Sequence, residues 1–288
     1  VSAAPLDGSP AEKAGLRPGD IILAVDGNSV EGLPLSEVVA EITGQVGTNV
    51  TLTIQDPTTG QTHDVTITRA DIKLVNVTWQ ILPGTNIAHV RVAEFSQGVT
   101  GDLQAALEEV QKQNVSGIIL DLRNDPGGLL DEAVGSASQF LTSGDVLLEK
   151  DAQGQTQAIP VKPGAVAPHI PMVVLVNHGT ASAAEIVTGA LQDAGRATVI
   201  GETTFGTGTV LQEFSLSDGS ALMLAVQEWL TPKGRVIWHK GLEPDIVVAL
   251  PQDVMPSFPL AERQMTAQQL AQTQDTQLSK AISVLTNK

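Results

Sequence analysis

The pattern of hydrophobic and polar positions predicts short strands and two helices in the first 72 residues. Residues 50–54 alternate hydrophobic and threonine side chains, which is typical of a half-buried strand. Residues 35–43 carry hydrophobic side chains three and four positions apart, which predicts a helix. The other expected elements are a short helix in residues 9–16 and strands at residues 21–25 and 65–67. We therefore expect a small β-rich domain over residues 1–72.

After residue 73 the pattern changes to strands and helices in alternation. The expected strands are residues 87–92, 117–122, 172–176, 199–201, 210–216 and 221–226, and the expected helices are residues 101–113, 129–141 and 181–194. This alternation predicts an α/β core over residues 73–250. Residues 251–288 are rich in glutamine and are expected to form a tail that is helical from Thr266.

Composition and charge narrow the classes of function. The 288 residues suggest about two domains, because a domain has roughly 150 residues. With 16 Lys and Arg against 32 Asp and Glu, the net charge is −16, which argues against nucleic acid and against an anionic membrane surface as partners. No hydrophobic run approaches the roughly 20 residues of a membrane span, and the first residues show no basic or apolar leader.

Few side chains are available for catalysis. The chain has no cysteine and no tyrosine, which excludes a thiol nucleophile, a thiolate metal site and a catalytic phenol. It has nine lysines, seven arginines and five histidines, so any general base must come from a short list.

The residues around Ser182 form the most informative segment. A hydrophobic strand is expected to end at Val176, a polar turn follows, and a helix is expected to begin among the small residues of Ala181–Ala184. At a helix N-terminus the dipole favours a developing negative charge on a serine, and free N–H groups can hold an oxyanion. The alternative is that Thr180 or Ser182 only caps the helix.

A second segment follows another predicted buried strand. Its adjacent glycines, Gly127 and Gly128, allow backbone N–H groups to approach a ligand, although an ordinary strand-to-helix loop is the alternative. The carboxylates of Asp121 and Asp125 raise the question of a metal site. No histidine is spaced with them, so we expect pairing with Arg123 or solvation instead.

Together the two segments resemble the carboxyl-terminal processing peptidases, serine peptidases that combine a PDZ domain with a crotonase-like α/β core. The further matching segments, in the same order, are Phe95-Ser96, Gly189–Asp193, Thr204–Gly206, Asp218–Leu222, Thr231–Arg235 and Gly241–Asp245. By this resemblance Ser182 is the nucleophile, and the N–H of Ala183 with one from Gly127 or Gly128 forms the oxyanion hole. The resemblance implies no metal and no organic cofactor.

The run Gly8–Gly27 resembles the PDZ domains of bacterial proteases. Such domains carry a first strand and a carboxylate-binding loop before this run, and neither precedes it in this sequence. We therefore expect a PDZ domain over residues 1–72 whose peptide groove lacks its N-terminal wall. The resemblance implies protein or peptide C-termini as partners and an extracytoplasmic location, in the periplasm or at the cell surface. It leaves the oligomeric state open.

One loop departs from the family pattern. These peptidases carry a lysine general base in the sequence Thr-Phe-Gly-Lys-Gly, whereas this chain has Thr207 in the place of the lysine. The family's glutamine, four positions later, is replaced by Leu211, and Gln212 remains a candidate one position further on. A threonine hydroxyl is too weak a base to deprotonate serine, so we expect weak or lost activity. The candidates for a replacement base are His178, His239 and Lys240.

Three functions are compatible with this sequence. The first is a serine endopeptidase that cleaves proteins near their C-termini through an acyl-enzyme on Ser182. The second is a catalytically inactive peptide-binding or scaffold relative, for which Thr207 is the main argument. The third is a protein that binds a hydrophobic ligand on the same core, because the segment Thr180–Glu185 resembles that of retinoid-binding relatives.

Overall fold

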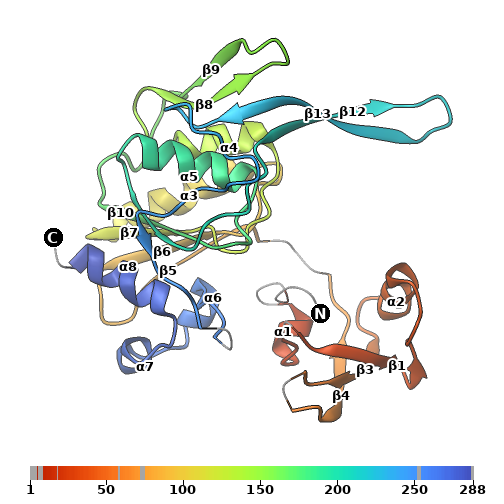
Figure 1. The fold of residues 1–288 in the computed structure, drawn as a ribbon. Helices are drawn as coiled ribbons and strands as arrows, with labels where there is room; N and C mark the ends of the chain where they lie inside the picture. The colour runs from red at the N-terminus through yellow and green to blue at the C-terminus, as the bar shows by residue number, and fades with distance from the viewer. Residues whose placement is uncertain are drawn as a thin grey trace. The chain divides into compact units, whose positions relative to one another are not determined.

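The computed structural model describes residues 5, 9–17, 19–57, 59–71, 75–251 and 254–286. The chain folds into two compact units, Val1–Val75 and Asn76–Lys288 (Figure 1). The boundary predicted between residues 72 and 73 falls on residues 72–74, which lie outside the described residues. The expected lack of an N-terminal strand and a carboxylate-binding loop concerns the start of the chain, where residues 1–4 and 6–8 also lie outside them.

The smaller unit is built on a four-stranded antiparallel sheet with the strand order β2-β1-β3-β4. Its elements are α1 (Pro10–Lys13), β1 (Ile21–Val25), β2 (Asn28–Ser29), α2 (Leu35–Ile42), β3 (Asn49–Gln55) and β4 (Thr62–Thr68). The alternation predicted for β3 is confirmed, because Val50, Leu52 and Ile54 are buried. The first helix is shorter than predicted and ends at Lys13, since Gly15 adopts a φ of +86° that a helix does not continue through.

The larger unit is centred on a six-stranded sheet with the strand order β14-β11-β10-β7-β6-β5. Its strands are β5 (Val77–Ile81), β6 (Ile87–Val92), β7 (Gly117–Asp121), β10 (Met172–Val176), β11 (Thr198–Gly201) and β14 (Ile246–Val247). Only the β5–β6 pair is antiparallel among the pairs of this sheet that the structure describes. Because β7 and β10 are parallel neighbours, the loops that follow them lie side by side at one sheet edge.

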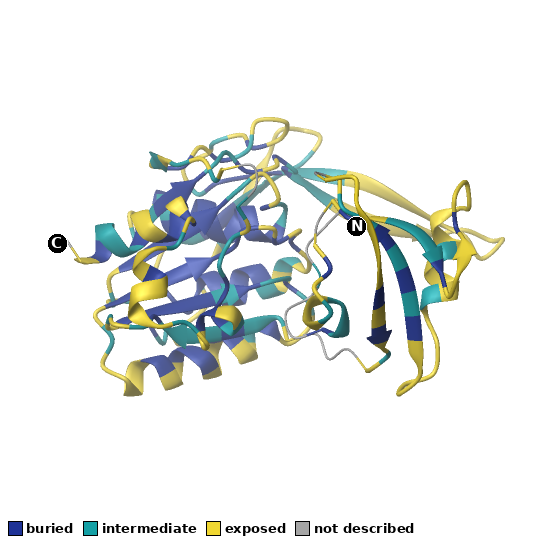
Figure 2. Cartoon of the chain, turned by 90° about the horizontal axis from the view of Figure 1, so that it is seen from below, coloured by how far each residue is buried: buried dark blue, intermediate teal, exposed yellow. Residues whose placement is uncertain are grey.

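Alternate side chains of this sheet enter two separate hydrophobic cores. Ile118 and Val174 pack on one face and Ile119 and Val173 on the other, as the twofold periodicity of a strand requires. The first face is covered by α3 (Val99–Lys112), α4 (Leu130–Ala137) and α5 (Ala183–Asp193), and the second by α7 (Ala267–Ala271) and α8 (Thr276–Thr286). Figure 2 shows the central strands of this sheet as buried and the outer sides of the helices as exposed. The C-terminal segment therefore belongs to the folded core of this unit.

A second sheet in this unit has the strand order β12-β13-β8-β9. Its strands are β8 (Asp145–Lys150), β9 (Thr156–Pro160), β12 (Thr209–Ser215) and β13 (Ala221–Leu230). The predicted strands at residues 210–216 and 221–226 form the long hairpin of β12 and β13 (Figure 1). The strands β8 and β9 were not predicted. The strand β9 is largely exposed and its sequence has no hydrophobic alternation.

The α/β fold class is confirmed, and each predicted helix of the core has a counterpart in α3, α4 and α5. Helix α4 is shorter than predicted and ends at Ala137. The hydroxyl of the next residue, Ser138, donates a hydrogen bond to the Val134 carbonyl. The helical tail begins earlier than Thr266, with α6 (Pro259–Glu262). Among the helices that the structure describes, none has the length and apolar character needed to cross a membrane.

Candidate active site

Ser182 lies at the N-cap of α5, directly after the turn that follows β10. Its φ of 52° and ψ of −117° are rare for a residue with a side chain. Two hydrogen bonds fix the preceding turn: the Thr180 hydroxyl donates to the Leu122 carbonyl at 2.8 Å, and the Ala181 N–H donates to the Asp125 carbonyl at 2.9 Å. The loop after β7 thus holds Ser182 in a strained conformation of the kind that clusters at active sites.

Gly127 and Gly128 lie in that loop, and Gly127 lies directly against Ser182. A Cβ atom on Gly127 would lie 2.6 Å from Ser182 Cβ and 2.8 Å from the Ala183 nitrogen, so no side chain fits there. The N–H of Gly127 donates to Asp125 Oδ1 at 2.8 Å. Over the described residues, the N–H groups of Gly128 and Ala183 donate no hydrogen bond within the protein. Two backbone donors are therefore free beside Ser182.

Glu185 joins Ser182 to the loop that carries Thr207. Its carboxylate is fully buried, and Oε2 accepts the N–H of Ser182 at 3.0 Å and that of Thr207 at 2.9 Å. The other oxygen accepts the N–H of Gly206 at 2.8 Å and the hydroxyl of Thr204 at 2.5 Å. Four donors match the four lone-pair positions of one carboxylate. This buried side chain therefore links the backbone of Thr207 to that of Ser182.

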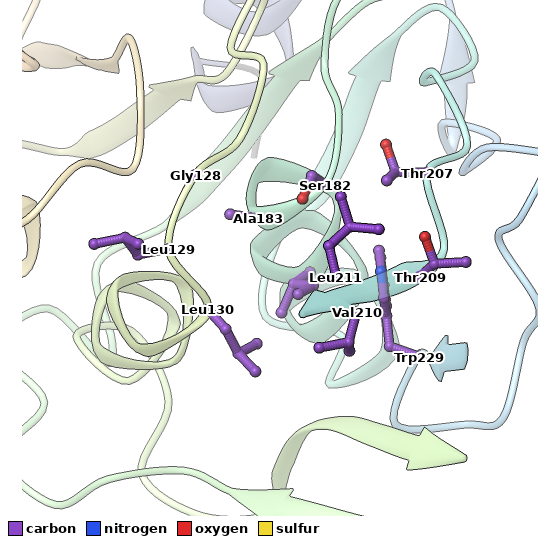
Figure 3. A pocket seen from close by; sticks show the side chains of 11 residues that line it. Gly128, Leu129, Leu130, Ser182, Ala183, Thr207, Thr209, Val210, Leu211 and Trp229 are labelled. Atoms are coloured by element: carbon purple, nitrogen blue, oxygen red, sulfur yellow. The ribbon is translucent and has the colours of Figure 1, made fainter. Parts of the chain in front are cut away.

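Ser182, Ala183, Gly128 and Thr207 line one pocket of about 240 Å³ (Figure 3). The other residues that line it are mostly apolar: Leu129, Leu130, Ile186, Thr209, Val210, Leu211 and Trp229. In Figure 3 the side chains of Ser182 and Thr207 lie at one end of this pocket, while Leu130 and Trp229 lie toward the other. When the carbonyl group of a peptide lies at Ser182, an apolar side chain of the same peptide can thus occupy the pocket.

The structure does not bring the other candidate side chains into this pocket. Gln212 is exposed on β12, whereas its neighbour Leu211 lines the pocket. His178, His239 and Lys240 are exposed, and none of them lines the pocket. The His239 N–H donates to the Gly206 carbonyl at 2.9 Å, so this segment supports the loop of Thr207 through its backbone.

The two aspartates of the loop after β7 differ in environment. Asp121 is buried and pairs with Arg123 at 2.5 Å and with His89 at 3.1 Å, so pairing is confirmed for this residue. Burial alone would raise the pKa of Asp121, but the charges of Arg123 and His89 hold it well below its usual range. For Asp125 the prediction of pairing or solvation is wrong, because this side chain is buried and forms no salt bridge within the described residues. Burial raises the pKa of Asp125 well above its usual value.

Sequence reasoning missed the role of Glu185 as the link between the two loops. The signal that identifies it is the spacing Ser182-x-x-Glu185, in which the glutamate of a capping box reaches back to the N-cap N–H. Across the described part of the chain, no three His, Cys, Asp or Glu side chains are grouped in a way that could hold a metal ion.

Two family models match this chain. The family model described as peptidase family S41 matches residues 86–248, and a PDZ domain model matches residues 1–56. A carboxyl-terminal-processing protease of Synechocystis sp. is 41% identical over 251 residues, which are 86% of this chain and 58% of that protein. A probable CtpA-like serine protease of Staphylococcus aureus is 39% identical over 86% of this chain and 50% of its own length. The chain thus spans 50–58% of the length of these relatives.

Two solved structures share the fold. The photosystem II D1 C-terminal processing protease superposes with a TM-score of 0.66 and 35% identity, covering 88% of this chain and 68% of that one. A putative S41 protease from Bacteroides fragilis superposes with a TM-score of 0.61, covering 85% of this chain and 69% of that one. At 24% identity, the second likeness concerns the fold alone.

Proposed function

The chain belongs to peptidase family S41, and from this we propose that it is a serine-type endopeptidase that cleaves proteins near their C-termini. The observation that carries the proposal is the position of Ser182, which is strained, lies at a helix N-terminus and shares one pocket with two free backbone donors. Relatives that bear the names carboxyl-terminal-processing protease and CtpA-like serine protease support the same reaction.

In the proposed reaction, Ser182 Oγ attacks the carbonyl carbon of the scissile peptide. The negative charge that develops on the carbonyl oxygen is held by the N–H groups of Gly128 and Ala183, because the Gly127 N–H already donates to Asp125. The C–N bond then breaks, the amine leaves with the proton that Ser182 released, and an ester remains on Ser182. Water hydrolyses this ester and restores the hydroxyl.

Removal of the proton from Ser182 is expected to be the slow step of this reaction. Thr207 lines the pocket at the position of the family's lysine, and its hydroxyl is as weakly basic as that of serine. Within the described residues, no lysine or histidine side chain lines the pocket to replace it. General-base help is typically worth about 10²–10⁴ in rate, so we expect turnover that is slow but dependent on Ser182.

The substrate is proposed to present an apolar residue to the pocket and its C-terminus to the PDZ domain. The apolar side chains of Leu130, Ile186 and Trp229 support the first part. A cavity of about 400 Å³ in the smaller unit, lined by apolar side chains that include Leu16 and Val50, supports the second. The family resemblance supports an extracytoplasmic location, which cell fractionation tests.

Digestion of casein and of peptides with apolar C-termini tests the reaction. The wild type is compared with Ser182→Ala and with Thr207→Lys at equal concentration. We expect Ser182→Ala to abolish cleavage and Thr207→Lys to raise the rate by about 10²–10⁴. Equal rates for the wild type and Ser182→Ala would contradict the proposal.

The second candidate function is peptide binding without cleavage. The presence of Thr207 in the pocket, at the place where the family has a lysine, favours it. In that case the wild type cleaves no faster than Ser182→Ala, while a peptide with an apolar C-terminus still binds to the wild type in a fluorescence anisotropy titration. The two candidate functions are thus distinguished by the same set of variants.

A further inference from the structure

Asp125 connects the two loops that form the candidate active site. Its main-chain carbonyl accepts the N–H of Ala181 at 2.9 Å, and its Oδ1 accepts the N–H of Gly127 at 2.8 Å. The side chain of Asp125 thereby holds the peptide between Pro126 and Gly127, and Gly127 lies directly against Ser182. The next peptide is held by the Phe95 N–H, which donates to the Gly127 carbonyl at 2.7 Å. Asp125 itself does not line the pocket, so it acts on the reaction without touching the substrate.

The second oxygen of this carboxyl group has an unusual environment. Asp125 Oδ2 is buried and has no hydrogen-bond partner within the described residues. A buried carboxylate with an unpaired oxygen is costly, whereas the protonated acid carries no charge. Burial is accordingly the main cause of the raised pKa of Asp125, and the nearby charge of Glu94 adds to it. The Gly127 N–H and the charge of Arg91 on β6 act in the opposite direction without overcoming it.

We propose that Asp125 is a positioning residue that holds Gly127 while uncharged, and that ionising it weakens the oxyanion site. This inference rests on the proposed peptidase function and deepens it. A negative charge on Asp125 would lie on the hydrogen-bond partner of Gly127, which lies directly against Ser182. Two like charges in a buried site repel each other, so the transition state loses stabilisation when Asp125 ionises.

Asp125→Asn separates charge from hydrogen bonding. The Asn side chain keeps an acceptor oxygen for the Gly127 N–H and has nearly the shape of the protonated acid, but it does not ionise. Asp151→Asn is the matched control, because Asp151 also accepts backbone N–H groups, from Gln153 and Gln155, but is only partly buried.

The first measurement follows the backbone amide signals of Gly127, Gly128 and Ala183 by NMR as the pH is raised. We expect one titration step at Gly127 in the wild type and in Asp151→Asn, and no such step in Asp125→Asn. This readout needs no catalytic activity. A Gly127 signal that does not titrate in the wild type, or that titrates equally in Asp125→Asn, overturns the proposal.

The second measurement is the rate at which a fluorophosphonate labels Ser182 at each pH. Across the titration step, the wild-type rate divided by that of Asp125→Asn is expected to fall about tenfold and then to level off. A constant ratio overturns the proposed effect on the oxyanion site. Absence of labelling at every pH in both proteins, with the Gly127 step lost only in Asp125→Asn, sinks the peptidase function and supports the holding role of Asp125.

Discussion

At the residue scale, the geometry around Ser182 depends on side chains that do not take part in bond making. Glu185 satisfies four donors from the nucleophile turn and from the loop of Thr207. Gly127 contributes by lacking a side chain, since only this allows its backbone to lie against Ser182. Both residues can therefore be tested by substitutions that leave Ser182, the proposed nucleophile, unchanged.

Replacing Glu185 with glutamine is expected to disrupt the site. The amide NH₂ group of glutamine would face backbone donors in place of an acceptor oxygen, and each orphaned donor costs about 1–3 kcal/mol. We expect the free energy of unfolding to fall by about 2 kcal/mol or more and peptidase activity to be lost, as measured by urea denaturation and peptide cleavage. Glu132→Gln is the control, because Glu132 also accepts two backbone N–H groups but is partly exposed. An equal loss of stability in both variants would contradict this role.

Replacing Gly127 with alanine tests the close approach to Ser182. The new Cβ would lie 2.6 Å from Ser182 Cβ, and the φ of +99° is unfavourable for alanine. We expect a loss of about 2 kcal/mol or more in stability and loss of fluorophosphonate labelling. Gly98→Ala is the control: Gly98 has a φ of +92°, but a Cβ added there would meet no atom within 4 Å, so this variant isolates the backbone strain of about 1 kcal/mol. Unchanged labelling in Gly127→Ala would exclude a tight fit at this position.

At the scale of elements, buried charges attach the C-terminal segment to the central sheet. His89 on β6 bonds to Glu262 of α6 at 2.8 Å and to Asp121 of β7 at 3.1 Å. Arg123 also pairs with Asp275, just before α8, at 2.9 Å. Burial alone would lower the pKa of His89, but Glu262 and Asp121 raise it to about 9. The imidazolium is therefore part of the folded structure at neutral pH.

This arrangement predicts a loss of stability at alkaline pH. A pKa of about 9 in the folded state, above 6.5 for free histidine, means that the stabilisation by His89 is complete below pH 6.5 and is lost as the pH rises through about 9. The total is on the order of 3 kcal/mol. Urea denaturation from neutral to alkaline pH measures it as the difference in pH dependence between the wild type and His89→Gln. His63→Gln, at an exposed histidine, is the control and is expected to behave as the wild type. The same pH dependence in all three proteins would refute the prediction.

At the scale of the whole molecule, the acidic charge is expected to influence which peptides reach the pocket. A net charge of −16 produces a field that attracts cations and repels anions, and salt screens this field beyond about 10 Å at 0.1 M. The net charge is a sum over the whole chain and does not depend on any one residue. The net charge is therefore expected to affect how tightly peptides bind more than the chemical step at Ser182.

Peptides of equal length and equal apolar C-terminus, one rich in lysine and one rich in glutamate, test this effect. We expect the lysine-rich peptide to bind about tenfold more tightly to Ser182→Ala at low ionic strength, with the difference decreasing as salt is added. The inactive variant is used so that binding is measured without cleavage, by fluorescence anisotropy. A difference that does not change with salt would show that local contacts, not net charge, distinguish the peptides.

Much of the fold was predictable because its elements have regular local patterns. The hydrophobic runs of β7 and β10 and the helical spacing of α3 and α5 identified the α/β core, and turn residues after each run marked the candidate site. The strands β5, β8, β9 and β14 were missed, because their sequences are short or mixed and they depend on neighbours for pairing. Hydrophobic patterns along the chain do not indicate which strands pair with each other.

The sequence by itself determined the class of fold and the segments around Ser182 and Gly127, and its resemblance to the peptidase family implies that Thr207 stands where that family has a lysine. The fold class and the two segments follow from residue types and their spacing along the chain. Only the tertiary structure decided that Glu185 holds four donors, that Asp125 is buried with an unpaired oxygen, and that the C-terminal segment is bonded to His89 and Arg123. The physical reason is that residues far apart in the chain determine whether a group is buried and which hydrogen-bond partners it has. Burial and partners in turn determine the position and the protonation of each group.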